Sequence, residues 1–472
     1  MFIVPLPFIV AYIEELAKAL KHYRPHRDLS DSQKTWLKYC LMGIMLTNTV
    51  CWAAFERVGL GGSYRPSALS WMFRHSGLPW HLLLASSVSL VLDRLGLKSG
   101  SLDLDDTDHR RAKQTKTIYG AHKVYDKKTS GYFNGQSIVF LLLVTRLVTI
   151  PVGFRFYRPD PNYQAWKKED DRLKKQGIKK AKRPKAPARD PNYPDKTELA
   201  LALLTEFRQF FPEFTVKSIH ADALFGTQAF MDKASSICGG AQTVSQLHAN
   251  QKVWFRGKEW KLEDFFKVYP GIDQTIVVRG GKEQQVTFGA ARLAVCAHSR
   301  KKRFVIALKY EGETEYRFLV ATDLSWRAID IIQAHTLRWL IEVFFEDWKL
   351  NEGWAQLAKQ PNEDGSSRSL ILSLLLDHAL ILHPEQQARL ENKAPACTVG
   401  SLLRQSRSEA FLECIRSVLA ADNPAEYFEK LVDKVKLLFP LAESEKHMSG
   451  RDLGRLEPTP SLRYHAAQVL GG

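Results

Sequence analysis

The sequence has few cysteines, and none of them is placed for a zinc site or a disulfide framework. Its six cysteines are spread singly over 472 residues, and no two of them have Cys-x-x-Cys spacing. A zinc domain or a small secreted disulfide-rich protein would need paired or closely spaced cysteines. The cysteine pattern therefore argues against both classes and fits a reducing cytosol.

Long apolar runs are also lacking. The apolar stretch at residues 1–13, MFIVPLPFIVAYI, has no basic residue in front of its apolar part and continues into Glu14 and Glu15. A secretory signal begins with positive charge, and a membrane-spanning helix needs about 20 apolar residues. We therefore interpret residues 1–13 as the start of a core helix and expect no membrane partner.

Acidic residues are scarce relative to basic ones. Lys and Arg together number 67 and Asp and Glu 51, which gives a formal net charge of +16 and a pI near 9.4. Such a balance favours a polyanionic partner, most simply nucleic acid, although charge alone gives affinity without sequence specificity. Hydrophobic residues make up 45% of the chain, which is typical of a globular protein, and the length predicts two to four domains.

The pattern of apolar residues divides the chain into five regions. Residues 1–98 have helical spacing and predict a helical, DNA-binding region. Residues 99–245 and 326–383 alternate buried strands with helices, which predicts an α/β core with a mixed sheet flanked by helices. Residues 246–325 are rich in strands and turns and predict a β-rich insertion, and residues 384–472 predict a helical C-terminal region.

A basic excursion interrupts the first part of the predicted core at residues 160–196. Residues 167–189 hold eleven Lys or Arg and three acids, and the sequence Asp-Pro-Asn-Tyr flanks them at 160–163 and 190–193. Such a run is solvated, so we expect it to be mobile without DNA and to add sequence-independent affinity. The cations expected to contact the DNA backbone are Lys174, Lys175, Lys179 and Lys180.

Three carboxylates stand at the ends of predicted elements. The stretch SLDLDDTDH (101–109) reads as a strand ending in acids, and a second strand runs into Asp222. On a helical wheel, residues 335–349 place Glu342 on a narrow ionisable stripe opposite an apolar face. The other members of this stripe are His335, Arg338, Glu346 and Lys349.

Carboxylates from two strand ends and a helix suit Mg²⁺, which prefers oxygen ligands. Two such ions about 3.5–4 Å apart support phosphodiester chemistry. Each element alone also fits a simpler structure: an acidic turn, a helix cap at Asp222, and a solvated helix face. The combination of order, spacing and basic charge favours the metal site.

This combination resembles the DDE motif of the bacterial cut-and-paste transposases of the insertion-sequence-four group. The last motif of that family is Tyr, two residues, Arg, three residues, Glu, six residues, Lys. The same spacing holds here, with His in the place of Tyr, in His335, Arg338, Glu342 and Lys349. The first two motifs correspond to LDDT with Asp106 and HADALFG with Asp222, and the resemblance covers roughly residues 100–385.

The resemblance implies an RNase H-like catalytic core with a β-rich insertion before the helix that bears the Glu. It implies that Asp106, Asp222 and Glu342 are catalytic and hold two Mg²⁺ ions, for which Mn²⁺ would substitute. The reaction would be hydrolysis at the terminal inverted repeats of an insertion sequence, followed by joining of the freed 3′-hydroxyl to target DNA. The alternatives are an RNase H-like DNA nuclease without strand transfer and a domesticated, non-catalytic DNA-binding protein.

The resemblance also implies the partners and the location. DNA would be bound both as transposon ends and as target, by a homodimer that pairs two ends, with the C-terminal helices as the place to look for dimer contacts. No small-molecule substrate is expected. The protein would act in the bacterial cytoplasm, associated with the nucleoid.

The third motif carries the implied DNA contacts. Arg338 would hold a phosphate near the cleaved end, and Lys349 the backbone further on. Trp339 flanks the polar stripe and either stacks on a base or serves plain packing. A neutral His335 is expected to donate to a DNA phosphate, the alternative being that it only caps the packing at the head of the helix.

Two choices within the motifs depend on local geometry. Strand alternation puts Asp105 and Asp106 on opposite faces of the predicted strand. The family pattern Asp-Thr selects Asp106, and Asp105 is the alternative. Ser325 is predicted to cap the helix that continues through residues 335–349.

Overall fold

The structure, a computed structural model, describes seven stretches of the chain. They are residues 4–26, 28–59, 64–111, 118–126, 129–278, 281–353 and 362–436. The final part of the predicted C-terminal region, residues 437–472, lies outside the described residues.

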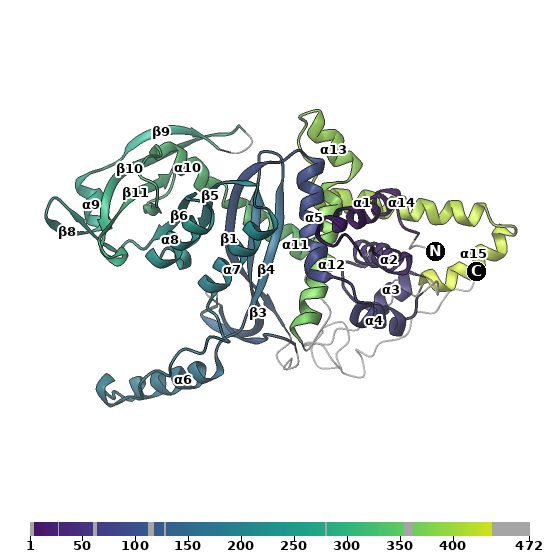
Figure 1. Ribbon diagram of the computed structural model, residues 1–472, viewed down its shortest axis with the longest axis horizontal. Coiled ribbons are helices and arrows are strands. Elements are labelled where there is room, and N and C mark those ends of the chain that lie inside the picture. The colour runs from purple at the N-terminus through teal and green to yellow at the C-terminus, as the bar shows by residue number, and fades with distance from the viewer. Residues whose placement is uncertain are drawn as a thin grey trace, which may run out of the picture.

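A mixed sheet runs through most of the molecule (Figure 1). Its strands are β1 (Ser99–Arg110), β2 (His122–Asp126), β3 (Gly131–Val144), β4 (Thr149–Tyr157), β5 (Thr215–Ala221), β6 (Gln242–Leu247), β7 (Lys252–Phe255), β8 (Lys258–Lys261), β9 (Ile272–Val277), β10 (Glu283–Val295), β11 (Lys301–Tyr310) and β12 (Arg317–Ala321). They follow the order β2-β3-β1-β5-β6-β12-β11-β10-β7-β8, with β4 paired to β3 and β9 paired to β10.

The core of the sheet has the order β4-β3-β1-β5-β6. Strand β3 is antiparallel to β4 and β1, whereas β5 is parallel to β1 and β6. This arrangement is that of an RNase H-like core, to which β2 adds a short strand beside β3. The predicted α/β fold class is confirmed.

Both faces of this core are covered, which explains its apolar central strand. Residues 135–144 of β3 are buried without interruption, the pattern of a strand between two layers. One layer is α7 (Lys196–Phe210), which contacts β3 and β4, with α8 (Gln228–Ile237) beside it on β6. On the other face lies α11 (Trp339–Asn351), whose Phe344, Phe345 and Trp348 pack against Phe140 of β3.

The β-rich insertion continues the core sheet. Strand β12 pairs antiparallel with β6, and β11, β10 and β7 follow outward from it. The insertion also contains α9 (Leu262–Val268) and the short helix η3 (Cys296–His298). Its strands therefore lie at one end of the molecule, away from the helical region (Figure 1).

Helices from the two ends of the chain form one body beside the sheet (Figure 1). Helix α12 contacts α1, α2 and α5, and α14 contacts α2. The helices are α1 (Pro7–Tyr23), α2 (Asp31–Thr47), α3 (Trp52–Val58), α4 (Pro66–His75), α5 (Trp80–Arg94), α12 (Glu363–Ile381), α13 (Pro384–Glu391), α14 (Val399–Leu419) and α15 (Pro424–Lys436). In the described residues no single helix is long and apolar enough to cross a membrane, although α12 and α13, bent by 47°, pass that test as a pair.

The basic excursion forms a helix in its first part, and its mobility without DNA stays a prediction. Helix α6 (Pro161–Lys175) projects from the sheet, and none of its side chains is buried (Figure 1). Asp160 caps its first turn by accepting from the backbone of Asn162, and Pro161 is favourable at the first helical position. An ion pair of 2.8 Å between Arg183 and Asp170 folds the following segment, with η1 (Lys180–Lys182), back onto α6.

The predicted continuous helix through residues 335–349 is broken. Helix α10 (Ala328–Thr336) ends before Leu337, and α11 begins at Trp339. Between them, the backbone amides of Leu337, Arg338 and Leu340 each bond to the carbonyl three residues earlier, the tighter 3₁₀ pattern. The helical wheel of a single helix therefore does not apply to His335, which the structure buries.

The predicted cap is also wrong. The N-cap position of α10 is Arg327, without a side-chain cap bond. Ser325 instead bonds through its backbone amide and hydroxyl to Asp323 Oδ1 in the preceding turn.

Two buried carboxyl groups lie where α11 meets α12. Glu352 is 0% exposed and Asp377 is 5% exposed. Burial raises the pKa of Asp377 to about 7, and burial together with Asp377 raises the pKa of Glu352 well above its usual value. The folded protein therefore keeps protons that the unfolded chain releases near pH 4.

We expect this pair to make the protein less stable as pH rises. Between about pH 4 and pH 7 the folded state binds more protons than the unfolded state, so the free energy of unfolding falls by an amount on the order of a few kcal/mol. Glu352→Gln removes one acid and should weaken this dependence. Denaturant unfolding between pH 5 and 8 measures it, with Glu346→Gln, at an exposed position of α11, as the control. Equal pH dependence in Glu352→Gln and the wild type would contradict the expectation.

Candidate functional site

The structure joins Asp105 and Glu342 through Arg338, and Asp222 lies close enough to Asp105 for its charge to act on that carboxyl group. Arg338 Nη1 lies 2.8 Å from Asp105 Oδ2, and Arg338 Nη2 lies 3.1 Å from Glu342 Oε1. Burial is the largest cause that raises the pKa of Asp105 to about 7, and the charge of Asp222 raises it further, against the opposing effect of Arg338. The three carboxylates come from β1, the end of β5, and α11.

Asp222 is fixed at the end of β5 by its own backbone and side chain. Its Oδ1 accepts from the amide of Leu224 at 2.9 Å and so caps the short helix η2 (Ala223–Phe225). Its carbonyl oxygen accepts from Ser245 Oγ on β6 at 2.6 Å. The helix-cap interpretation of Asp222 therefore holds structurally, and it leaves the carboxylate near Asp105.

Asp106 does not join the other two carboxylates, which corrects the choice made from the family pattern. Strand β1 is regular here, with Asp105 opposite Phe140 and Asp106 opposite Val139 of β3. Successive side chains of a regular strand point to opposite faces. Asp106 consequently faces Lys196 at the start of α7, with Oδ2 to Nζ at 2.5 Å, and Asp105 faces α11.

The remaining cation of the third motif lies close to the same face. Lys349 Nζ contacts Thr107 Oγ1 at 2.5 Å, two residues beyond Asp105 on β1. Burial lowers the pKa of Lys349. Arg338 and Lys349 thus both contact β1, at Asp105 and Thr107.

Trp339 lies at a cavity beside Glu342. Its ring is 64% exposed, and the cavity, of about 810 Å³, is also lined by Tyr310, Arg317 and Gln246. The exposure argues against plain packing as the role of Trp339, since a packed indole is covered.

His335 is not placed to meet a DNA phosphate. The residue is 6% exposed, and its Nε2 lies 3.1 Å from Gln246 Nε2 on β6. Burial, with a smaller contribution from Arg338, lowers the pKa of His335 to about 3. His335 is therefore neutral, as expected, but the expected phosphate contact is not available in this conformation.

The four lysines of the basic excursion lie apart from the carboxylates. Lys174 and Lys175 end α6, and Lys179 and Lys180 begin the segment with η1. All four are exposed. The excursion extends away from the sheet, so it contributes charge at a distance from the site (Figure 1).

A buried pair beneath the site was not predicted. Asp103 Oδ1 and His220 Nδ1 are 2.7 Å apart, and both side chains are 0% exposed. Each stands two residues before a carboxylate of the site, so strand alternation gives it the same face. That spacing, in Asp103-x-Asp105 and His220-x-Asp222, was the signal in the sequence that could have identified the pair.

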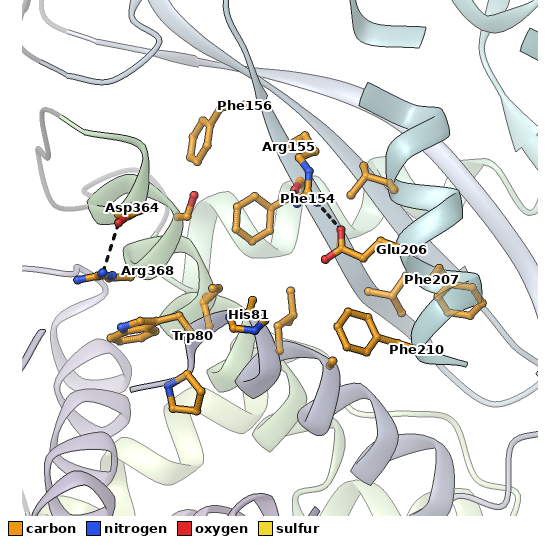
Figure 2. Close-up of a pocket in the computed structure, with 18 of the residues that line it drawn as sticks. Trp80, His81, Phe154, Arg155, Phe156, Glu206, Phe207, Phe210, Asp364 and Arg368 are labelled. Carbon is orange, nitrogen blue, oxygen red and sulfur yellow. Dashed lines mark hydrogen bonds and ion pairs between the residues drawn. The ribbon is translucent and has the colours of Figure 1, made fainter. Parts of the chain in front are cut away.

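A separate cavity of about 440 Å³ lies between the helical body and the core sheet (Figure 2). Phe154, Phe156 and Phe207 line it from β4 and α7, and Trp80 from α5. Ion pairs of Arg155 with Glu206 and of Arg368 with Asp364 stand at its wall. Its lining contains none of the three carboxylates, so it is distinct from the candidate site.

The three carboxylates have the chemistry of ligands for a divalent cation, but their side chains are not arranged around one ion position. Within the described ranges, no three His, Cys, Asp or Glu side chains are arranged to hold a metal ion. The donors are nevertheless the oxygen ligands that Mg²⁺ prefers. The raised pKa of Asp105 reflects burial and the repulsion of Asp222, which a cation would relieve, and Arg338 lies between Asp105 and Glu342.

Comparison with known proteins points to a nuclease-type family. Residues 31–262, a range that contains Asp105 and Asp222 but not Glu342, match the family described as DDE superfamily endonuclease. This supports a DDE nuclease or transposase-like family without distinguishing the insertion-sequence-four group.

No curated protein sequence matches the chain. The crystal structure of the NurA nuclease from Sulfolobus solfataricus is similar over 50% of this chain and 72% of that chain, with 7% identity and a TM-score of 0.24.

Proposed function

We propose that the protein is a DDE-type DNA transposase that binds the terminal inverted repeats of an insertion sequence, cleaves the ends and joins the 3′-hydroxyl to target DNA. The observation that carries the proposal is the pairing of Arg338 with both Asp105 and Glu342, with Asp222 near Asp105, on an RNase H-like sheet. The match to DDE endonucleases and the basic charge support DNA as the substrate. A nuclease that cuts without joining is the second candidate.

The three carboxylates would hold the divalent ions, Mg²⁺ or Mn²⁺. When bound, two such ions activate the attacking oxygen and stabilise the leaving oxygen of a phosphodiester. Arg338 neutralises Asp105 and Glu342 in their absence. Its planar guanidinium can bind a phosphate in the same way as it binds a carboxylate, so incoming DNA would draw it from the acids to the substrate.

The other contacts of the DNA follow from exposure and charge. Lys349 would hold the backbone beyond the cleaved end, and Trp339 would stack on a base at the cavity that it lines. The helical region 1–98 would contribute to end recognition. The proposal predicts terminal inverted repeats in the DNA just outside the gene. The purified protein should bind a duplex with that repeat sequence in preference to a scrambled duplex.

A homodimer on paired ends is part of the proposal. Helix α14 leaves an apolar face uncovered, where Leu412, Ile415 and Leu419 are 40–71% exposed, and α15 adds Phe428 at 55%. Exposed apolar surface of this kind is typical of contacts between proteins. The mass of the protein in solution, with and without end DNA, should therefore include a dimer.

The basic excursion should determine much of the salt dependence of DNA binding. Changing Lys174, Lys175, Lys179 and Lys180 to Gln should make the slope of log K against log[salt] less negative by about 0.9 for each phosphate that the variant no longer neutralises. A matched control changes Arg389, Lys393, Arg416 and Lys430, exposed cations of the C-terminal helices. If both quadruple variants keep the slope of the wild type, the excursion does not bind the backbone.

A further inference from the structure

A second layer of polar side chains lies directly beneath the candidate site. Asp103 on β1 and His220 on β5 are register neighbours in the parallel pair, and their side chains are bonded. Asp105 follows on β1, and Asp222 follows at the end of β5. The bond between Asp103 and His220 therefore ties together the two strands that carry the first two carboxylates.

His335 and Gln246 form a second bonded pair next to the first. Gln246 comes from β6, the neighbour of β5, and His335 from the last turn of α10, three residues before Arg338. His220 is the register neighbour of Val244 on β6, Gln246 lies two residues further on the same face of that strand, and α10 itself contacts β5. Both rings are buried, and each has one nitrogen without a hydrogen-bond partner: His220 Nε2 and His335 Nδ1.

Each unpartnered nitrogen belongs to a ring whose other nitrogen is bonded. The amide nitrogen of Gln246 only donates, so His335 Nε2 accepts and the neutral ring carries its proton on Nδ1. The carboxylate of Asp103 accepts from His220 Nδ1–H, which leaves Nε2 of that ring for another partner. Two buried ring nitrogens thus remain unpaired in the same layer, and leaving both unpaired would be costly.

We propose that Asp103, His220, His335 and Gln246 form one hydrogen-bonded chain, closed by one water between the two rings, that positions the ligands of the divalent ions. The inference rests on the proposed function and deepens it. These hydrogen bonds connect β1, β5, β6 and α10. They therefore fix the strands that carry Asp105 and Asp222 relative to the turn that leads to Glu342. His335, which stands where the family has Tyr, is here a positioning residue.

We expect the affinity for the divalent ion to fall when this series of hydrogen bonds is interrupted at His335. His335→Phe keeps an aromatic ring but removes both nitrogens. Mn²⁺ binding to the full-length protein without DNA, followed by electron paramagnetic resonance, should weaken about 10-fold or more, because partners behind metal ligands typically control affinity by 10–100-fold. The Mg²⁺ concentration for half-maximal cleavage should rise by the same factor.

His378→Phe is the matched control. His378 is also a fully buried histidine, bonded to Ser87 Oγ and the carbonyl of Pro151 in the helical body. It should lose stability without a change in Mn²⁺ affinity. If His335→Phe binds Mn²⁺ as tightly as the wild type, or if His378→Phe weakens binding equally, the positioning role is overturned.

The tautomers can be read in the wild-type protein, which keeps the inference testable if His335→Phe does not fold. Nitrogen-15 NMR of labelled histidines should show a neutral His335 protonated on Nδ1, and protonation on Nε2 would break the proposed chain. A wild type that neither binds Mn²⁺ nor cleaves DNA would refute the proposed function itself. If the wild type binds Mn²⁺ and cleaves DNA, and His335→Phe binds Mn²⁺ equally tightly, only the proposed series of hydrogen bonds is refuted.

Discussion

Asp105→Ala is expected to abolish metal-dependent DNA cleavage, whereas Asp106→Ala should leave most of it. Asp105 faces Arg338, Glu342 and the charge of Asp222, while Asp106 faces Lys196 on the other side of β1. Removing a ligand of a catalytic ion costs several kcal/mol of transition-state stabilisation, and about 4 kcal/mol corresponds to roughly a thousandfold in rate. Asp222→Ala and Glu342→Ala should be as severe.

Initial rates of cleavage on one end DNA, at saturating Mg²⁺, measure this prediction. Binding to the same DNA should persist in all four variants, since three of the carboxylates would hold ions rather than DNA and Asp106 faces Lys196. Lys196 loses its partner in Asp106→Ala, so the thermal stability of each variant is recorded beside its rate. If Asp105→Ala cleaves at a normal rate and a folded Asp106→Ala is inactive, Asp106 is the ligand, as the sequence pattern predicts.

Arg338→Ala is expected to slow cleavage by an amount that corresponds to about 2–5 kcal/mol, the usual cost of removing one partner of a buried charged pair. The guanidinium is only 18% exposed and contacts two of the three carboxylates. Arg338→Lys should recover part of the loss at most, because an ammonium cannot bind a phosphate through two parallel bonds.

Arg327→Ala is the control for Arg338. Arg327 is the N-cap residue of α10, its side chain is 78% exposed, and within the described residues its ion pair is with Asp330 on that helix. Its loss should change the rate little. Near-normal rates for both variants would mean that the charges of the third motif are merely a solvated helix face.

The sequence predicts the fold class because the apolar pattern is strong. Residues 135–144 are apolar enough to require cover on both faces, and α7 and α11 provide it. The spacing from Arg338 to Glu342 also predicts their contact, since four residues make one helical turn. The apolar strand and the contact of Arg338 with Glu342 are both determined by residues close together in the sequence.

The choice between Asp105 and Asp106 depends on tertiary structure instead. Alternation shows that the two side chains point apart, but which face α11 covers is set by packing against Phe140, far along the chain. The burial of His335 has the same origin, because a helical wheel does not contain the 3₁₀ break at residues 337–338. For α6, the density of charge in the sequence indicated a solvated run and not the helix that Asp160 caps.

Strand transfer by the purified protein tests the central claim most directly. A duplex that carries the element's end, labelled on the strand with the 3′-hydroxyl, is incubated with Mg²⁺ and a circular target DNA. We predict that the label becomes covalently joined to the target in the wild type and not in Asp105→Ala, Asp222→Ala or Glu342→Ala. Cleaved ends that never join would indicate a nuclease, and neither product in a folded, DNA-binding protein would contradict the assignment of the three carboxylates as an active site.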